Sequence, residues 1–130
     1  MKLPDTLSSL EWIQVRAARS DRLILEIANT PAWFGCYPQA ICIAMDTGLI
    51  IDDIDWLQRV CLWFASMRSC VNDCLLLESD HLFLARSHPA TQSTSEWENS
   101  LNQQLAVTDW LTKNGAMSVT STPHQMGSWR

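Results

Sequence analysis

The stretch Asp52–Val71 constrains the fold most, because it is the longest segment of this chain with one unbroken helical period. Apolar residues recur in it at steps of three and four, which predicts an amphipathic helix. Carboxylates in its first turn favour the positive end of the helix dipole, and a cation near its other end is favoured as well. The apolar stripe expected to face the core is Ile54, Leu57, Cys61, Phe64, Met67 and Val71.

A second apolar set falls on a neighbouring face of the same segment, again at steps of four and three. A helix with two apolar faces needs two coverings. We expect one face to pack on the strands of the chain and the other on a second copy or a partner protein. The alternative is that a single monomer buries both faces. The candidate dimer or partner seam is Trp56, Val60, Trp63 and Met67.

The composition narrows the class of protein. A chain of 130 residues with 47% hydrophobic and 18% charged residues is expected to fold as one domain. A net charge of −5 argues against binding to nucleic acid or to an anionic membrane surface. Seven tryptophans are many for a small core, so we expect one or more of them to face a partner.

The five cysteines do not suggest a metal site or a disulfide framework. Their number is odd, they lack zinc-type spacing, and we see no secretory signal at the N-terminus. We therefore expect free thiols in a reducing cytoplasm, with Cys36 the only one exposed. The five are Cys36, Cys42, Cys61, Cys70 and Cys74.

The first half of the chain reads as a helix followed by strands. Residues Met1–Ser20 are expected to form a helix, because Ser8 and Glu11 match a capping box. Leu23–Ala28 and Ala40–Met45 are expected to be strands that pair directly with each other, antiparallel, and Asp46-Thr47-Gly48 to close the second one. The intervening residues 29–38 are read as a short strand or an ordered loop.

The second half reads as a hairpin and a helix. Two apolar runs in Leu75–Arg86 flank the turn composition Glu78-Ser79-Asp80-His81, which predicts a β-hairpin. After a loop at 87–93, a capping box of Ser95 and Glu98 predicts a helix over 96–113 that ends at Asn114-Gly115. Residues 116–130 are expected to be a mobile tail. The chain is thus predicted to be one α+β domain over residues 1–115, an antiparallel sheet faced by helices, in the order α-β-β-(β)-α-β-β-α.

No catalytic or cofactor constellation stands out in the sequence. His81, His88 and His124 share no spacing that predicts convergence on a metal, and no glycine-rich loop precedes a helix. Cys36 beside Gly35 could serve as a nucleophile if His81 or His88 approached it, but an incidental thiol explains it more simply. We therefore expect a protein without enzymatic activity and without a cofactor.

The order of elements resembles the bacterial type III secretion chaperone family. The local match is the hairpin Leu75–Arg86, with the leucine-rich run Asp80-His81-Leu82-Phe83-Leu84, followed by Pro89 and a polar loop into the last helix. The resemblance covers residues 7–114 in topology. The chain departs from the family in the proline- and aromatic-rich segment Pro31–Pro38, in its tail and in its tryptophan content.

The resemblance implies a cytoplasmic, non-catalytic homodimer that binds a segment of a secreted effector. Chaperone-like relatives in plant-pathogen secretion systems instead bind regulatory proteins, and the departures leave room for that type. The alternative is another cytosolic interaction or regulatory domain with the same α+β plan. The candidate partner-binding patch is Leu25, Ile27, Trp33, Phe34, Ile41 and Ile43.

Overall fold

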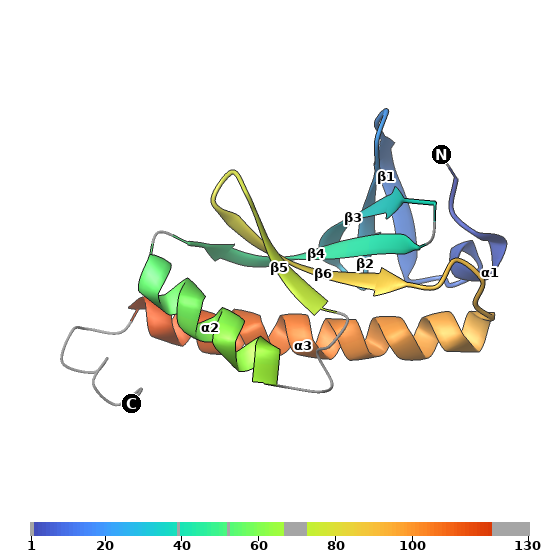
Figure 1. The fold of residues 1–130 in the computed structure, drawn as a ribbon. Helices are drawn as coiled ribbons and strands as arrows, with labels where there is room; N and C mark the ends of the chain where they lie inside the picture. The colour runs from blue at the N-terminus through green and yellow to red at the C-terminus, as the bar shows by residue number, and fades with distance from the viewer. Residues whose placement is uncertain (1, 39, 52, 67–72, 121–130) are drawn as a thin grey trace.

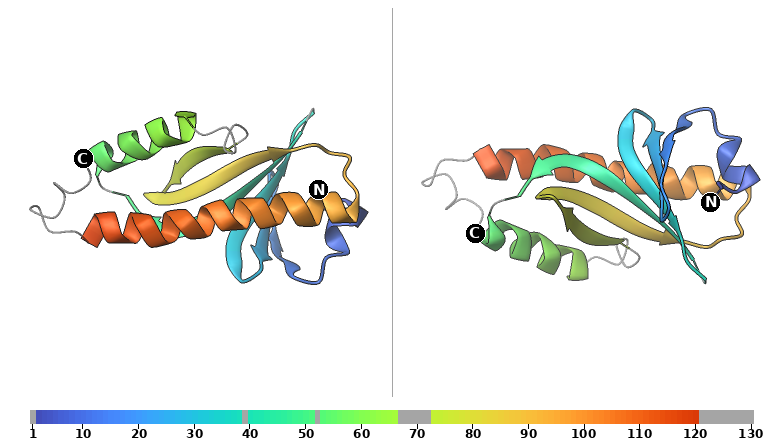
Figure 2. Two further views of the ribbon diagram at one scale, coloured as in Figure 1. Left: turned by 90° about the horizontal axis from the view of Figure 1, so that it is seen from below. Right: turned by 90° about the horizontal axis from the view of Figure 1, so that it is seen from above.

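The computed structural model describes residues 2–38, 40–51, 53–66 and 73–120, with the backbone alone for 63–66 and 115–120. Its architecture is α+β: a six-stranded antiparallel sheet with helices, as the sequence predicts. Both long helices lie on one face of the sheet, here called the inner face (Figures 1 and 2). The elements in chain order are α1 (Asp5–Ser8), β1 (Ile13–Ala18), β2 (Leu23–Ile27), β3 (Thr30–Cys36), β4 (Ile41–Ile50), α2 (Ile54–Ser66), β5 (Asp73–Glu78), β6 (His81–His88) and α3 (Thr94–Thr120).

The sheet has the strand order β1-β2-β3-β4-β6-β5. The β2–β3 and β5–β6 hairpins each close with two residues at positive φ, Ala28 and Asn29 in the first and Ser79 and Asp80 in the second. Such two-residue turns match the twist of the flanking strands. The predicted hairpin is therefore confirmed. The predicted direct pairing of Leu23–Ala28 with Ala40–Met45 is wrong, because β3 lies between those strands.

The N-terminal helix predicted over Met1–Ser20 is wrong. Only Asp5–Ser8 is helical, and Ile13–Ala18 pairs with β2 as an edge strand. The expected capping box is not formed, since Ser8 Oγ donates to Asp5 O instead. Most of β1 is exposed, so strand pairing rather than burial places this segment in the sheet.

Strand β4 continues past its predicted end. The Gly48 N–H donates to Asp46 Oδ1 at 2.8 Å, and Thr47 Oγ1 donates to Leu82 O at 2.8 Å. Gly48 has a φ of +78°, which glycine adopts at little cost. These contacts coincide with an irregularity in the β4–β6 pairing. The turn-type residues therefore make a bulge inside a strand.

Helix α3 holds the inner face through both apolar and polar contacts. Trp97 and Leu101 enter the main core against the β2–β4 strands, and Leu111 enters a second core with α2. Gln104 Nε2 on the same helix donates to Ile43 O at 2.8 Å, and Thr112 Oγ1 donates to Thr47 O at 2.7 Å. These bonds fix how the helix is seated along β4.

Both ends of α3 differ from the prediction. The capping box forms two residues earlier, with Ser93 N–H donating to Glu96 Oε1 at 3.0 Å and Glu96 N–H donating to Ser93 Oγ at 3.2 Å. The helix continues through Asn114-Gly115 to Thr120, so residues 116–120 of the expected tail are helical. The remainder of that tail lies outside the described residues.

Candidate functional site

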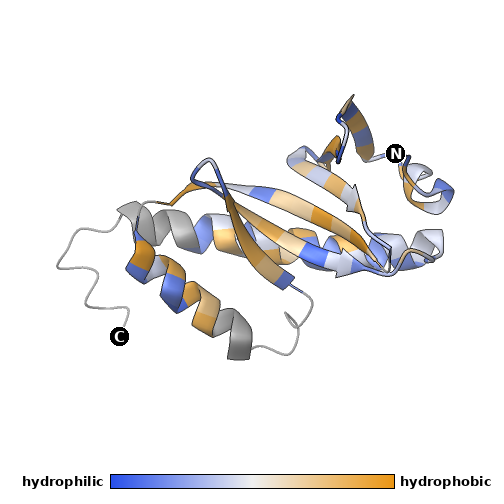
Figure 3. Ribbon diagram, turned by 45° about the horizontal axis from the view of Figure 1, so that its top comes forward, coloured by the Kyte–Doolittle hydropathy of each residue, from blue (hydrophilic) through white to orange (hydrophobic). Residues whose placement is uncertain are grey.

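Helix α2 begins where the sequence predicts a long helix. The Trp56 N–H donates to Asp53 Oδ1 at 3.2 Å, so a predicted first-turn carboxylate caps the helix. Figure 3 shows hydrophobic and hydrophilic bands alternating along α2. The helix therefore has faces of different character, and its contacts show which one is buried.

The seam residues at the start of α2 face the core of the chain. Trp56 and Val60 are only 3% and 7% exposed and pack with Leu49, Leu82 and Leu111. They are therefore not available at the surface of a single chain. The expectation that Trp56 and Val60 form a dimer or partner seam is wrong. The side chain of Trp63 and all of Met67 lie outside the described residues.

The opposite face of α2 is open and carries apolar side chains around the exposed Gln58. Ile54 and Leu62 are 59% and 72% exposed, and Cys61 is exposed between them in sequence. Spacings of seven and eight residues place all three on one side of a helix. The helix thus carries apolar residues on two faces, but the predicted assignment is wrong for four of them: Trp56 and Val60 are inside, while Ile54 and Cys61 are outside. Leu57 of the predicted core stripe does pack on the second core, and the exposed Leu62 belongs to neither predicted set. Ile54, Cys61 and Leu62 are called the α2 surface below.

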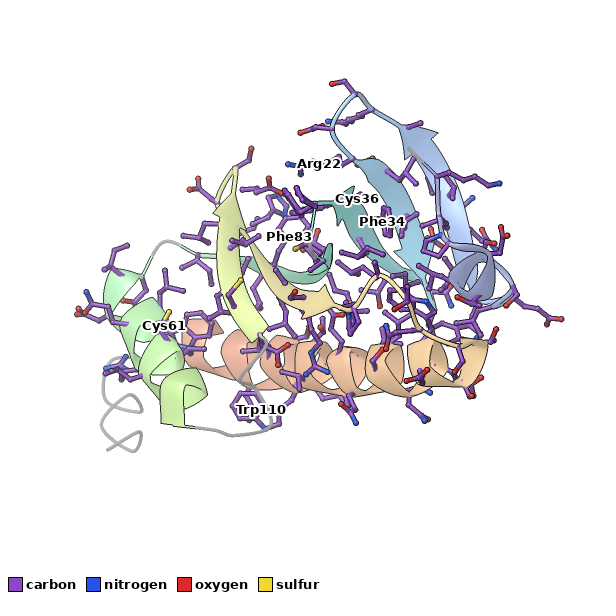
Figure 4. All side chains as sticks on the ribbon, turned by 45° about the vertical axis from the view of Figure 1, so that its right-hand side comes forward. Arg22, Phe34, Cys36, Cys61, Phe83 and Trp110 are labelled. Atoms are coloured by element: carbon purple, nitrogen blue, oxygen red, sulfur yellow. The ribbon has the colours of Figure 1, made fainter. Side chains whose placement is uncertain are left out.

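Three further exposed apolar residues belong to elements that share a core with α2. Ile50 ends β4, Leu77 lies on the edge strand β5, and Trp110 lies on α3. Figure 4 shows Trp110 on the side of α3 away from the sheet and Cys61 on α2. Most of the large exposed hydrophobic residues among those described therefore come from this part of the fold.

The predicted strand patch is not a surface either. Leu25, Ile27, Phe34, Ile41 and Ile43 are all buried in the main core beneath α1 and α3. Near-continuous apolar strands cannot reveal from sequence which face a helix will cover. Because these residues are covered, the inner face of the sheet is not an open binding site.

Trp33, the remaining member of that patch, lies on the outer face beneath a polar cluster. The Arg22 guanidinium stacks 4.2 Å from the Trp33 ring centroid, and Trp33 Nε1 donates to Glu78 Oε1 at 3.0 Å. Arg22 Nη1 also donates to both Glu78 oxygens, at 3.2 and 3.1 Å. The cluster covers Trp33, which has Ala44 and Ala85 beside it in a small third core.

The structure does not bring either histidine close to Cys36, so it does not support this cysteine as an activated nucleophile. Strand β4 separates Cys36 from His88, because Ile41 pairs with both of them. His88 is buried and bonded to Gln104, while His81 lies near Asp46 at the other end of β6. Cys61 and Cys74 are exposed as well, so the expectation that Cys36 alone is exposed is wrong.

Cys42 and the partly exposed Cys74 both have a raised pKa. Burial, and then the neighbouring Cys74, raises the pKa of Cys42. Burial, and then Asp73, raises the pKa of Cys74. Because the thiolate is the reactive species, these shifts lower the reactivity of both cysteines near neutral pH.

The described part of the chain has one further recess worth noting. It encloses about 510 Å³ between the β2–β3 turn, the β4 bulge and α3, and its lining includes Asp46, Asp109 and several threonines. With no lysine or arginine among its lining residues, it is a poor fit for phosphate. Within the described ranges, no group of three or more His, Cys, Asp or Glu residues could hold a metal ion.

Comparison with known proteins adds no family. No family model matches the chain, and no curated protein matches its sequence. Among the residues described, no helix is both long and apolar enough to span a membrane.

Proposed function

We propose that this protein is a non-catalytic protein-binding module, a chaperone or chaperone-like adaptor of the type III secretion kind. In this proposal the α2 surface pairs with the same surface of a second copy. The dimer then holds a segment of a secreted effector or a regulatory protein. No cofactor takes part.

The open apolar face of α2 carries the proposal. Ile54 and Leu62 are more than half exposed, although the helix already has a buried face built from Trp56 and Val60. Burying one such side chain in an interface contributes roughly 1.5–3 kcal/mol. A helix that presents apolar side chains on both faces fits a partner on the second one.

The element order supports the chaperone type. The resemblance rests on a first helix, strands, a central helix, a hairpin and a last helix. The structure contains the later elements in that order, with only the four-residue α1 in place of the first helix. The hairpin that carries the leucine-rich run is formed, with β5 at the edge of the sheet. An edge strand offers unpaired backbone groups to an extended segment of a client, and the half-exposed Leu77 lies on it.

A second candidate is an interaction domain that binds a folded regulatory protein. The burial of Leu25, Ile41 and Ile43 favours this candidate, because it removes the sheet face through which an extended client would be held. The α2 surface would then contact the regulator directly.

Affinity capture from the native cell tests the proposal and separates the two candidates. The bait is the full chain, as wild type, as the double variant Ile54→Ser/Leu62→Ser, and as the control Val15→Ser. Val15 is also 50% exposed but lies on the far edge strand β1. We expect wild type and the control to retain a common partner that the double variant loses. A secreted protein as that partner supports the chaperone, and a transcription regulator supports the second candidate. Equal recovery by all three baits contradicts a role for α2.

A further inference from the structure

His88 is buried between β6 and α3, away from the α2 surface. His88 is the last residue of β6 and is 2% exposed. His88 Nε2 lies 2.9 Å from Gln104 Oε1, and its ring centroid lies 5.2 Å from that of Trp97. Both partners belong to the first half of α3, so the imidazole joins this helix to the sheet.

The surrounding bonds determine the tautomer of His88. Gln104 Nε2 donates to Ile43 O at 2.8 Å and to Leu84 O at 3.2 Å, which fixes the orientation of its amide. Gln104 Oε1 is then directed at His88 and can only accept. His88 therefore carries a hydrogen on Nε2, and the neutral ring satisfies this bond.

The two charged neighbours of His88 act in opposite directions on its protonation. Arg86 precedes it on the same face of β6, and Asp73 on β5 is already paired with that arginine. Strand β4 places Ile41 opposite His88, α3 contributes Trp97 and Gln104, and α1 adds Leu7 to the core around Trp97. Burial is the main cause that lowers the pKa of His88; the Gln104 bond and Asp73 oppose it, and Arg86 adds to it.

We propose that His88 is an acid-sensitive latch, whose protonation favours separation of the first half of α3 from the sheet. Water can solvate the imidazolium only when the Trp97–Gln104 segment moves away from β6. Since Trp97 and Leu101 cover the main core, this opening exposes apolar strand residues such as Leu25 and Ile43. The latch does not depend on the function proposed for α2.

The direction of the pH effect follows from proton linkage. In the opened segment His88 has an ordinary pKa of about 6.5, whereas the closed segment has a lower one. As the pH falls below about 6.5, the opened state binds a proton that the closed state does not bind. The free energy of opening therefore falls with the pH, until the pH reaches the pKa of the closed state.

Amide hydrogen exchange of the full chain tests the latch. We expect the exchange of residues 97–105, corrected for intrinsic rates, to rise at pH 5.0 relative to pH 7.5. The rise is about tenfold for each pH unit below 6.5 until the closed pKa is reached, so it is at most about thirtyfold at pH 5.0. The His88→Gln variant is expected to lose this rise, and His81→Gln, on an exposed histidine, to keep it.

An equal rise in His88→Gln, or no rise in wild type, overturns the proposal. If His88→Gln does not fold, ¹⁵N NMR of the imidazole in the unmodified protein decides the matter. A titration midpoint below the ordinary 6.5, with the neutral ring protonated at Nε2, supports the latch, and a midpoint at or above 6.5 overturns it.

Discussion

Arg22 and Glu78 meet at 3.1 Å although three strands of the sheet lie between theirs. Arg22 directly precedes β2, next to the edge strand β1, and Glu78 ends the other edge strand β5, so they lie near diagonally opposite corners. In a flat sheet, four strand spacings alone would separate them by about 19 Å. The strong twist seen in Figure 1 brings these corners together over the outer face, and Trp33 is buried beneath them.

The first prediction concerns the contact between Arg22 and Glu78. Glu78→Ala removes the carboxylate that binds both Arg22 and the Trp33 N–H, and should lower the free energy of unfolding by about 1–2 kcal/mol. The matched control is Glu26→Ala, whose partner Arg16 is half exposed and makes no aromatic contact in the described structure. Urea unfolding measures both variants. An equal loss in the two would contradict a special role for the Arg22–Glu78 pair.

Sequence could not reveal that contact, because nothing local links residues 22 and 78. It did predict the antiparallel α+β sheet, the hairpin and a helix with two apolar faces. It assigned the wrong burial to Ile54 and Trp56 because both are large and apolar, and only the sheet and Leu111 decide which of them is covered. Tertiary packing, rather than periodicity, assigns the open surface.

The second prediction tests the buried ion pair of β5 and β6. Asp73 has a side chain with 0% exposure, and its Oδ2 accepts from Arg86 Nη2 at 2.8 Å. Asp73→Ala should cost about 3–5 kcal/mol, because it leaves the arginine charge buried without its partner. The double variant Asp73→Leu/Arg86→Met should cost less than this single change. Thermal unfolding gives the comparison, and a larger loss in the double variant would argue against burial of an unpaired charge as the cause.

The third prediction concerns the N-terminus of α3. Ser93→Ala removes the capping box seen in the structure and should cost about 1 kcal/mol. Ser95→Ala removes the serine of the capping box expected from the sequence, and should cost little. Chemical denaturation distinguishes them, and the reverse order of stability would mean that the helix begins two residues later. The sequence contains two overlapping S-x-x-E patterns, Ser93–Glu96 and Ser95–Glu98. Sequence alone cannot decide which of them caps the helix, because this depends on the conformation of the preceding loop.

The fourth prediction concerns the β2–β3 turn. Ala28 has a φ of +48°, in the left-handed region that costs most L-residues energy and that asparagine tolerates. Ala28→Asn should therefore raise the free energy of unfolding by about 1 kcal/mol. The control is Ala18→Asn on the exposed strand β1, which we expect to be neutral or destabilising. No gain at position 28 would show that the turn is not strained.

The same turn explains why the N-terminal half was harder to read. Ala28-Asn29 lacks the glycine that usually marks such a turn, so β3 could not be distinguished from a loop. With β3 unassigned, the sequence predicts direct pairing of β2 with β4. It also predicts a helix at Ile13–Ala18, although the strand that pairs with this segment, β2, is itself predicted.

The most direct test of the central claim is the mass of the protein in solution across the micromolar range, by sedimentation equilibrium. The account predicts twice the 14.8 kDa chain mass for wild type and for Val15→Ser, and a shift toward one chain mass for Ile54→Ser/Leu62→Ser. A single chain mass for wild type at every concentration, unchanged by these substitutions, would contradict pairing through α2.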